Sequence, residues 1–176
     1  KAPGAGLLII QDYGIVDEAV YGVRSLSDRT PVSRSDVWNI GSDGKAMTAV
    51  MIARLVDRGV LSWESTIGGV LPDMSGDVRP EYRAITLQQL LTHTSGLVSG
   101  GLSGTEARKV ALKGKESLAD YIPRLGGVPL DFQPGSRWAY SAQAGFDTLA
   151  RVVEVVSGMP FDQFTKTRIF DPLGMK

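Results

Sequence analysis

The sequence predicts an α/β (α+β) fold in which an antiparallel sheet is flanked by helices and followed by a mostly helical region. Two apolar runs, residues 7–10 and 16–23, flank a short turn and predict a β-hairpin. Residues 42–58 and 144–156 carry apolar side chains at helical spacing, and a glycine soon follows each. A lone two-stranded hairpin is not stable in water, so we expect its strands to join a larger sheet that this chain leaves incomplete.

The first half of the chain offers further, shorter elements. Residues 25–36 are polar and predict a loop, and residues 37–40 predict a short strand. Residues 61–71 contain a glycine pair, and we expect them to be irregular. Residues 85–91 predict a short helix with Thr86 at the N-cap.

The second half alternates loops and helices. Residues 95–104 are rich in glycine and serine and are expected to form an exposed loop. Residues 116–121 predict a short helix that Pro123 stops, and residues 126–135 predict another loop. Residues 161–170 predict a final amphipathic helix.

Composition excludes several classes of protein. The 176 residues include 19 basic and 19 acidic side chains, which gives no electrostatic case for a nucleic-acid partner. No apolar run approaches the length of a membrane span. The absence of cysteine excludes disulfides, thiolate zinc sites and a cysteine nucleophile, and a single histidine disfavours a metal site, so we expect no cofactor or metal. We recognise no signal peptide, and the compartment stays open between cytoplasm and periplasm.

Residues 41–45 read Gly-Ser-Asp-Gly-Lys at the start of the first predicted helix. If that helix begins at Ser42, the side chain of Lys45 lies on the same face. A serine hydroxyl is a weak nucleophile unless a base accepts its proton, and a lysine becomes such a base when burial or a nearby cation lowers its pKa. The other reading is an N-cap serine beside a surface lysine. The apolar neighbours of Lys45 in this helix favour catalysis.

Other arrangements of a serine hydrolase fit the sequence less well. The Gly-x-Ser-x-Gly elbow is absent. A Ser-His-Asp triad would have to use His93, which lies at the end of the helix predicted over residues 85–91. We expect His93 to form a local hydrogen bond that fixes this turn.

Four segments together resemble one superfamily. They are NIGSDGKAMTA at residues 39–49, ITLQQLLTHTSGL at residues 85–97, QPGSRWAYS at residues 133–141, and residues 151–175. In this order they resemble the serine β-lactamases and penicillin-binding-protein-like enzymes, in the branch of class C β-lactamases and family VIII carboxylesterases. The resemblance runs from Pro3 to the end of the chain.

The resemblance implies a β-lactamase-like fold, of which residues 1–176 form the N-terminal part. Residues 1–60 would hold the hairpin and the nucleophile helix, and residues 61–176 a mostly helical subdomain. Ser42 would be the acylated nucleophile, with its backbone N–H as an oxyanion donor, and Lys45 would accept or relay its proton. Tyr140 would be a second base beside Ser42, its pKa lowered by neighbouring cations. Without the resemblance, Tyr140 reads as a buried aromatic residue.

Two departures from the family pattern stand out. Where the family has an asparagine amide two residues after the tyrosine, this sequence has Ala142 followed by Gln143, so we expect these two to contact the substrate. The family's third motif, on a later strand that supplies a second oxyanion donor, is missing before Lys176. We therefore expect the C-terminal half of the domain, as a missing segment or second chain, to complete the site, and little activity from this chain alone.

The leading hypothesis is a carboxylesterase that cleaves small or short-chain esters. A β-lactamase or a D-amino-acid-specific peptidase is the alternative enzyme, and a non-catalytic scaffold of the same fold is the alternative class. Residues 97–114 are expected to border the cleft. The small residues Ala139 and Ala142 suit an acyl pocket, whereas Trp38 and Trp138 are expected in the core.

Overall fold

The computed structural model describes residues 2–72, 74, 78–97 and 114–175. The chain forms two compact units, Lys1–Ile40 and Gly41–Lys176. The predicted border of the cleft, residues 97–114, lies outside the described residues except at its two ends. Leu97 is buried there, whereas Gly114 is exposed.

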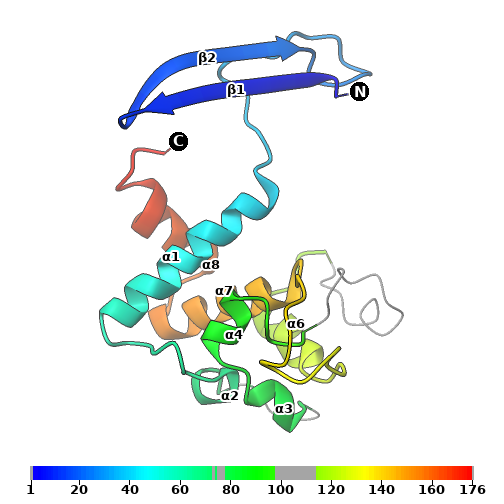
Figure 1. Ribbon diagram of the computed structural model, residues 1–176, viewed down its shortest axis with the longest axis vertical. Helices are drawn as coiled ribbons and strands as arrows, with labels where there is room; N and C mark the ends of the chain where they lie inside the picture. The colour runs from blue at the N-terminus through cyan, green and yellow to red at the C-terminus, as the bar shows by residue number, and fades with distance from the viewer. Residues whose placement is uncertain (1, 73, 75–77, 98–113, 176) are drawn as a thin grey trace. The chain divides into compact units, whose positions relative to one another are not determined.

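The first unit is built on the predicted hairpin. Strands β1 (Gly4–Gln11) and β2 (Gly14–Gly22) pair antiparallel, as Figure 1 shows. Asp12 and Tyr13 connect them, both with positive φ (50° and 64°). Two successive residues with positive φ make a type I′ turn, whose twist matches that of the flanking strands.

Both faces of the hairpin carry exposed apolar side chains. Four consecutive apolar residues in β1 lie between 43% and 62% exposed: Leu7, Leu8, Ile9 and Ile10. Successive side chains of a strand point to opposite faces, so such a run is typical of a strand that is covered on both sides. Trp38, predicted in the core, is 47% exposed. That prediction is wrong in this structure, although atoms of the Trp38 ring lie close to Gly6.

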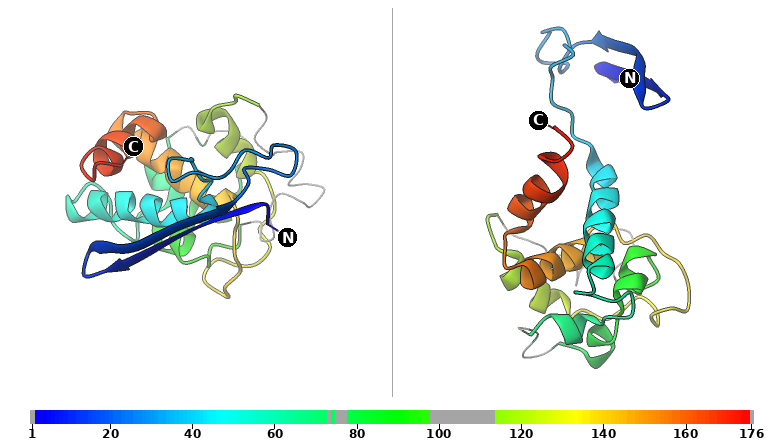
Figure 2. Two further views of the ribbon diagram at one scale, coloured as in Figure 1. Left: turned by 90° about the horizontal axis from the view of Figure 1, so that it is seen from above. Right: turned by 90° about the vertical axis from the view of Figure 1, so that its left-hand side faces the viewer.

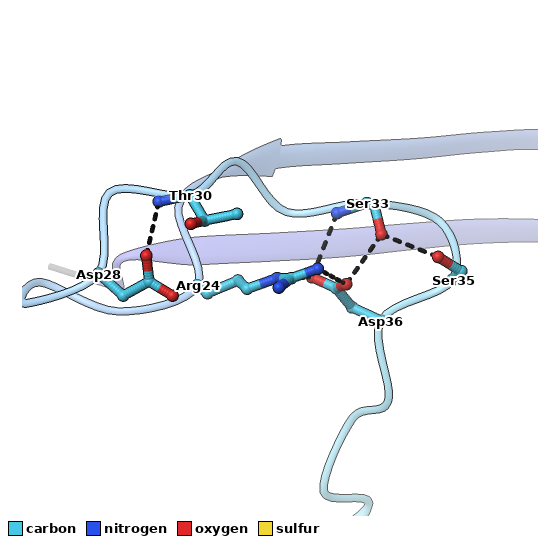
Figure 3. A network of polar contacts seen from close by, with 6 residues as sticks. All are labelled: Arg24, Asp28, Thr30, Ser33, Ser35 and Asp36. Carbon is cyan, nitrogen blue, oxygen red and sulfur yellow. Dashed lines mark hydrogen bonds and ion pairs between the residues drawn. The ribbon is translucent and has the colours of Figure 1, made fainter.

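The Asp36 carboxylate is the centre of the hydrogen bonds in the loop that follows β2. Residues 37–40 are irregular, so the strand predicted there is wrong. Figure 3 shows Asp36 accepting two hydrogen bonds from the Arg24 guanidinium (2.8 and 3.1 Å) and two from Ser33, through its N–H and hydroxyl (3.2 and 2.8 Å). These bonds close the loop between Arg24 and Asp36.

The Asp36 carboxyl is expected to titrate far below its usual range. Hydrogen bonds from Arg24 and Ser33 lower the pKa of Asp36 to about 2. Because the pKa is depressed in the folded chain, the stabilisation is complete above the ordinary value and is lost as the pH falls from there through about 2. An NMR titration should show the Ser33 amide following this midpoint. In Asp36→Asn the transition should disappear, and an Asp36 midpoint near the ordinary value would contradict the geometry.

The second unit is helical. Its elements are η1 (Gly41–Asp43), α1 (Gly44–Asp57), α2 (Ile67–Val70), α3 (Pro80–Arg83), α4 (Leu87–Leu91), α6 (Leu118–Leu125), α7 (Ala144–Ser157), α8 (Phe161–Thr165) and the π-helical turn η2 (Lys166–Phe170). Helix α7 contacts α1, α2, α4, α6 and α8, so it is the central helix of this unit (Figure 1, Figure 2). Among the described residues, no helix has both the length and the hydropathy to cross a bilayer.

The helix ends follow local sequence rules. The Thr86 hydroxyl accepts a hydrogen bond from the Gln89 N–H, and the Gln89 side chain accepts one from the Thr86 N–H, which is a capping box. Gly158 ends α7 with a left-handed φ of 66°. These two predicted ends are confirmed.

Three expectations are wrong in this unit. Helix α2 interrupts residues 61–71, because the Thr66 side chain caps it by accepting from the Gly69 N–H. Residues 95–97 are buried rather than exposed. Helix α6 continues past Pro123 to Leu125, since burial of its apolar face offsets the single backbone bond that proline removes.

One apolar core joins the helices of the second unit. Many of its fully buried members lie on four of the helices: Met51 and Ile52 of α1, Leu87 and Leu90 of α4, Tyr121, Ile122 and Leu125 of α6, and Leu149, Val152 and Val153 of α7. Each such side chain contributes about 1.5–3 kcal/mol relative to an exposed one. The core therefore fixes α1 relative to α4 and α7. The predicted site residues lie at the amino-terminal end of α1 and in the segment that precedes α7.

Candidate active site

Ser42 and Lys45 lie at the start of α1. Ser42 belongs to the 3-10 turn η1, and Lys45 is the second residue of α1, so the helix begins two residues later than predicted. The expected geometry still holds, because the Lys45 Nζ donates a hydrogen bond to the Ser42 Oγ at 3.2 Å. Ser42 is exposed and Lys45 is half-buried. The serine oxygen is thus open to a substrate while its neighbour is partly withdrawn from water.

Tyr140 approaches Ser42 from a distant part of the sequence. Its hydroxyl lies 2.8 Å from the Ser42 Oγ, within the same unit. An ammonium group only donates, so Ser42 accepts from Lys45 and has its own proton free for Tyr140. The structure therefore brings the three predicted residues into one hydrogen-bonded chain. Tyr140 is 38% exposed, which contradicts the reading of this residue as a buried aromatic.

The segment that carries Tyr140, residues 131–141, is bound along its length to residues 93–96. The backbone N–H groups of Asp131, Gly135 and Ala139 donate to the carbonyls of Gly96, Thr94 and His93 at 2.8, 2.8 and 3.0 Å. A further bond joins the Ser141 N–H to the His93 Nδ1 at 3.2 Å. The hydrogen bond of the His93 ring is thus long-range, and the expectation of a local one is wrong.

Gly96 permits this pairing. Its φ is 77°, and a Cβ built there would lie 2.1 Å from the Phe132 carbonyl oxygen, which is backbone and unable to yield. We expect Gly96→Ala to lower the free energy of unfolding by at least about 2 kcal/mol, because the left-handed conformation and the overlap both oppose a side chain. Denaturant unfolding followed by circular dichroism measures the loss.

Gly158 offers a matched control for that substitution. It also has a positive φ, 66°, but nothing lies within 4 Å of its missing Cβ. Gly158→Ala should therefore show the conformational cost alone, about 1 kcal/mol. Equal losses in the two variants would mean that the close approach to Phe132 does not hold in solution.

The electrostatics of the cluster favour a negative charge on Tyr140. Hydrogen bonds with Ser42 and Lys45, together with the charge of Lys45, lower the pKa of the Tyr140 phenol. The Lys45 Nζ lies 5.3 Å from the centre of the Tyr140 ring and 5.4 Å from that of Phe146. Burial raises the pKa of Asp147, on α7, against the opposing effect of Lys45. One cation is thus shared by a phenol and a nearby carboxyl.

The remaining predicted residues lie close to this cluster. Gln143 is exposed at the N-cap of α7, and Ala142 beside it is half-buried. Ala139 is also half-buried, whereas Trp138 is 64% exposed and not in the core as expected. The Trp138 ring instead meets the His93 ring edge-on at 6.3 Å. Within the described residues, no three acidic or histidine side chains gather as metal ligands.

Comparison with known families and proteins agrees with this geometry. The family model described as Beta-lactamase matches residues 1–176. The chain is 31% identical to penicillin-binding protein 4 of Amycolatopsis lactamdurans over 98% of its own length and 43% of that protein. It is 29% identical to esterase EstB of Burkholderia gladioli, over 98% of the chain and 46% of that protein.

A solved structure shares the fold. The chain superposes on EstCE1, described as a hydrolase with promiscuous acyltransferase activity, with a TM-score of 0.86 at 22% identity. The match covers 99% of this chain and 47% of that one. The chain therefore spans less than half the length of each of these three relatives.

Proposed function

Because this chain belongs to the beta-lactamase family of serine hydrolases, we propose that it carries the nucleophile of a carboxylesterase for small or short-chain esters. The observation that carries the proposal is the hydrogen-bonded chain from Lys45 through Ser42 to Tyr140. In it the Ser42 Oγ lies 2.8 Å from the Tyr140 hydroxyl oxygen. A serine that has both a cationic donor and a phenol of lowered pKa is set up for proton loss.

The proposed acylation gives each of the three side chains a separate role. The Ser42 Oγ attacks the ester carbonyl carbon while its proton passes to the Tyr140 phenolate oxygen. Lys45 holds the phenolate by its charge and hydrogen bond. The tetrahedral intermediate then expels the alcohol, which takes the proton from Tyr140. Water then gives a proton to the same phenolate as its oxygen attacks the acyl carbonyl carbon. The second tetrahedral intermediate breaks its bond to the Ser42 Oγ, Tyr140 returns the proton to Oγ, and the acid is released.

The oxyanion of the intermediate needs donors that are already in place. The Ser42 N–H lies just before α1, where the helix N-terminus favours negative charge, so we propose it as one donor. The second donor would come from polypeptide outside residues 1–176. The exposed apolar residues on both faces of β1 support such a segment, because they need cover that the described hairpin does not provide.

The identity of the substrate rests on the residues after Tyr140. Ala142 stands where the family places an amide, and Gln143 is exposed beside it. An amide that holds a β-lactam or peptide is therefore replaced by a methyl group, which suits a simple ester better. The relative named as an esterase supports the same choice.

Parallel assays on the full-length protein test this proposal. We expect turnover of a short p-nitrophenyl ester and no formation of penicilloate from a penicillin. Ala142→Asn provides the matched variant, because it restores an amide at that position. The opposite pattern, penicillin hydrolysis without ester hydrolysis, would establish a β-lactamase instead, and labelling of Ser42 by a fluorophosphonate without turnover of either would leave a non-hydrolytic member.

A further inference from the structure

His93 holds a backbone conformation that normally belongs to glycine. Its φ is 58°, and it directly follows the C-cap Thr92 of α4. The His93 N–H donates to the Leu90 carbonyl and the Thr94 N–H to the Gln89 carbonyl, which is the Schellman pattern of a helix end. A side chain at this position costs about 1 kcal/mol relative to glycine. Because glycine adopts this conformation at lower cost, a histidine here suggests that its side chain makes a specific contact with another part of the structure.

The ring and carbonyl of His93 bind the backbone on both sides of Tyr140. The His93 carbonyl accepts from the Ala139 N–H at 3.0 Å, and its Nδ1 accepts from the Ser141 N–H at 3.2 Å. Between these two bonds the imidazole packs against the phenol ring, with centroids 4.6 Å apart. The residue that bears the phenol is therefore fixed before and after, and its ring is supported.

We propose that His93 is a positioning residue that sets the Tyr140 oxygen beside Ser42 and does so only while its imidazole is neutral. The proposal rests on the proposed function of Tyr140 as the base. A neutral imidazole with its proton on Nε2 leaves Nδ1 free to accept from Ser141. A protonated imidazole has N–H groups at both nitrogens, so it cannot accept, and the hold on Ser141 is lost.

The surroundings of the ring keep it neutral near pH 7. Partial burial lowers the pKa of His93, and the charge of Lys45 on α1 lowers it further. Trp138, Tyr140 and Phe146 are the aromatic neighbours of the ring. Tyr140 also titrates, and the charge of Lys45 lowers the pKa of the Asp147 carboxyl, next to Phe146 on α7, against the effect of burial. Since the pKa is depressed, the neutral form persists to pH values below 6.5, and acylation should fall as the pH drops through that pKa.

His93→Gly separates this role from folding. Glycine keeps the carbonyl that Ala139 needs and relieves the left-handed backbone, which offsets part of the loss of the ring contacts, so the variant should remain folded with a cooperative thermal transition. The rate at which a fluorophosphonate labels Ser42 in the full-length protein should nevertheless fall by about ten- to a hundredfold, because the Tyr140 oxygen is less well placed. Both quantities are measured at pH 8.

His93→Asn is the matched rescue. Asparagine tolerates positive φ, and its side-chain oxygen offers an acceptor near the position of Nδ1. Labelling should recover to within about threefold to tenfold of the wild type, and the acid limb of the pH profile assigned to His93 should vanish. Failure of wild-type Ser42 to label would overturn the function of the site and this role with it. Normal labelling by His93→Gly would overturn the positioning role alone. So would survival in His93→Asn of the limb assigned to His93, as distinct from the rise in rate that follows deprotonation of Tyr140.

Discussion

Replacing Ser42 with alanine is expected to abolish fluorophosphonate labelling and to reduce ester turnover to the background rate. The acyl-enzyme forms on the Ser42 Oγ, the atom that contacts both Tyr140 and Lys45. Removal of the nucleophile from a serine hydrolase costs on the order of a million-fold in kcat. Ser42 is exposed in a short 3-10 turn, so the free energy of unfolding should hardly change. Intact-mass measurement and kcat for a p-nitrophenyl ester check the result.

Ser136→Ala is the control for that experiment. Ser136 is also exposed and lies in the segment that leads to Tyr140, but its hydroxyl donates to the Gln133 carbonyl. It should label and turn over like the wild type. An adduct that remains in Ser42→Ala, or one that peptide mapping assigns to another serine, would show that the nucleophile lies elsewhere.

The fold was readable from the sequence where local rules decide it. The β-lactamase-like fold and the membership of the superfamily are confirmed by the family match and by the structural likeness. The hairpin, α1, α4 and α7 follow from alternation, helical spacing, the Thr86 cap and the Gly158 stop.

Local sequence rules gave wrong predictions where tertiary contacts determine the structure of a segment. Proline normally ends a helix, yet α6 passes Pro123 because Tyr121, Ile122 and Leu125 are fully buried on its inner face. Residues 95–97 look like an exposed glycine-serine loop, but they are buried by pairing with the segment before Tyr140. Neither contact leaves a periodic signal in the sequence, because both partners are distant along the chain.

The same distinction applies to the candidate site. Ser42 and Lys45 are three residues apart, so helical geometry alone predicts their contact. Tyr140 could be predicted as a site residue only from the family resemblance, because 98 positions separate it from Ser42 in the sequence. The partner of the His93 ring was missed for the same reason. A signal did exist, because a histidine at the end of a helix, where glycine is usual, indicates a side chain with a contact to make.

The second large effect concerns Lys45 and Tyr140, which we expect to act on one proton transfer. Lys45→Met and Tyr140→Phe should each lower kcat for the ester by about a hundred- to ten-thousandfold. Methionine keeps the unbranched stem of Lys45 beside the rings of Tyr140 and Phe146, and phenylalanine keeps the ring that packs against His93. The variants therefore remove the reacting groups while retaining most of the packing.

The double variant decides between one shared step and two separate ones. If Lys45 serves Tyr140, the double variant should be about as slow as the slower single variant, whereas independent contributions would multiply. The pH profile adds a second readout. Lys45 lowers the pKa of Tyr140, so Lys45→Met should raise that pKa and move the rise in rate to higher pH. Lys166→Met, which removes an exposed lysine paired with Asp171, should leave the profile unchanged. Multiplicative losses with an unshifted pH profile would mean that Lys45 and Tyr140 act independently. Lys45, rather than Tyr140, would then be the candidate acceptor of the Ser42 proton.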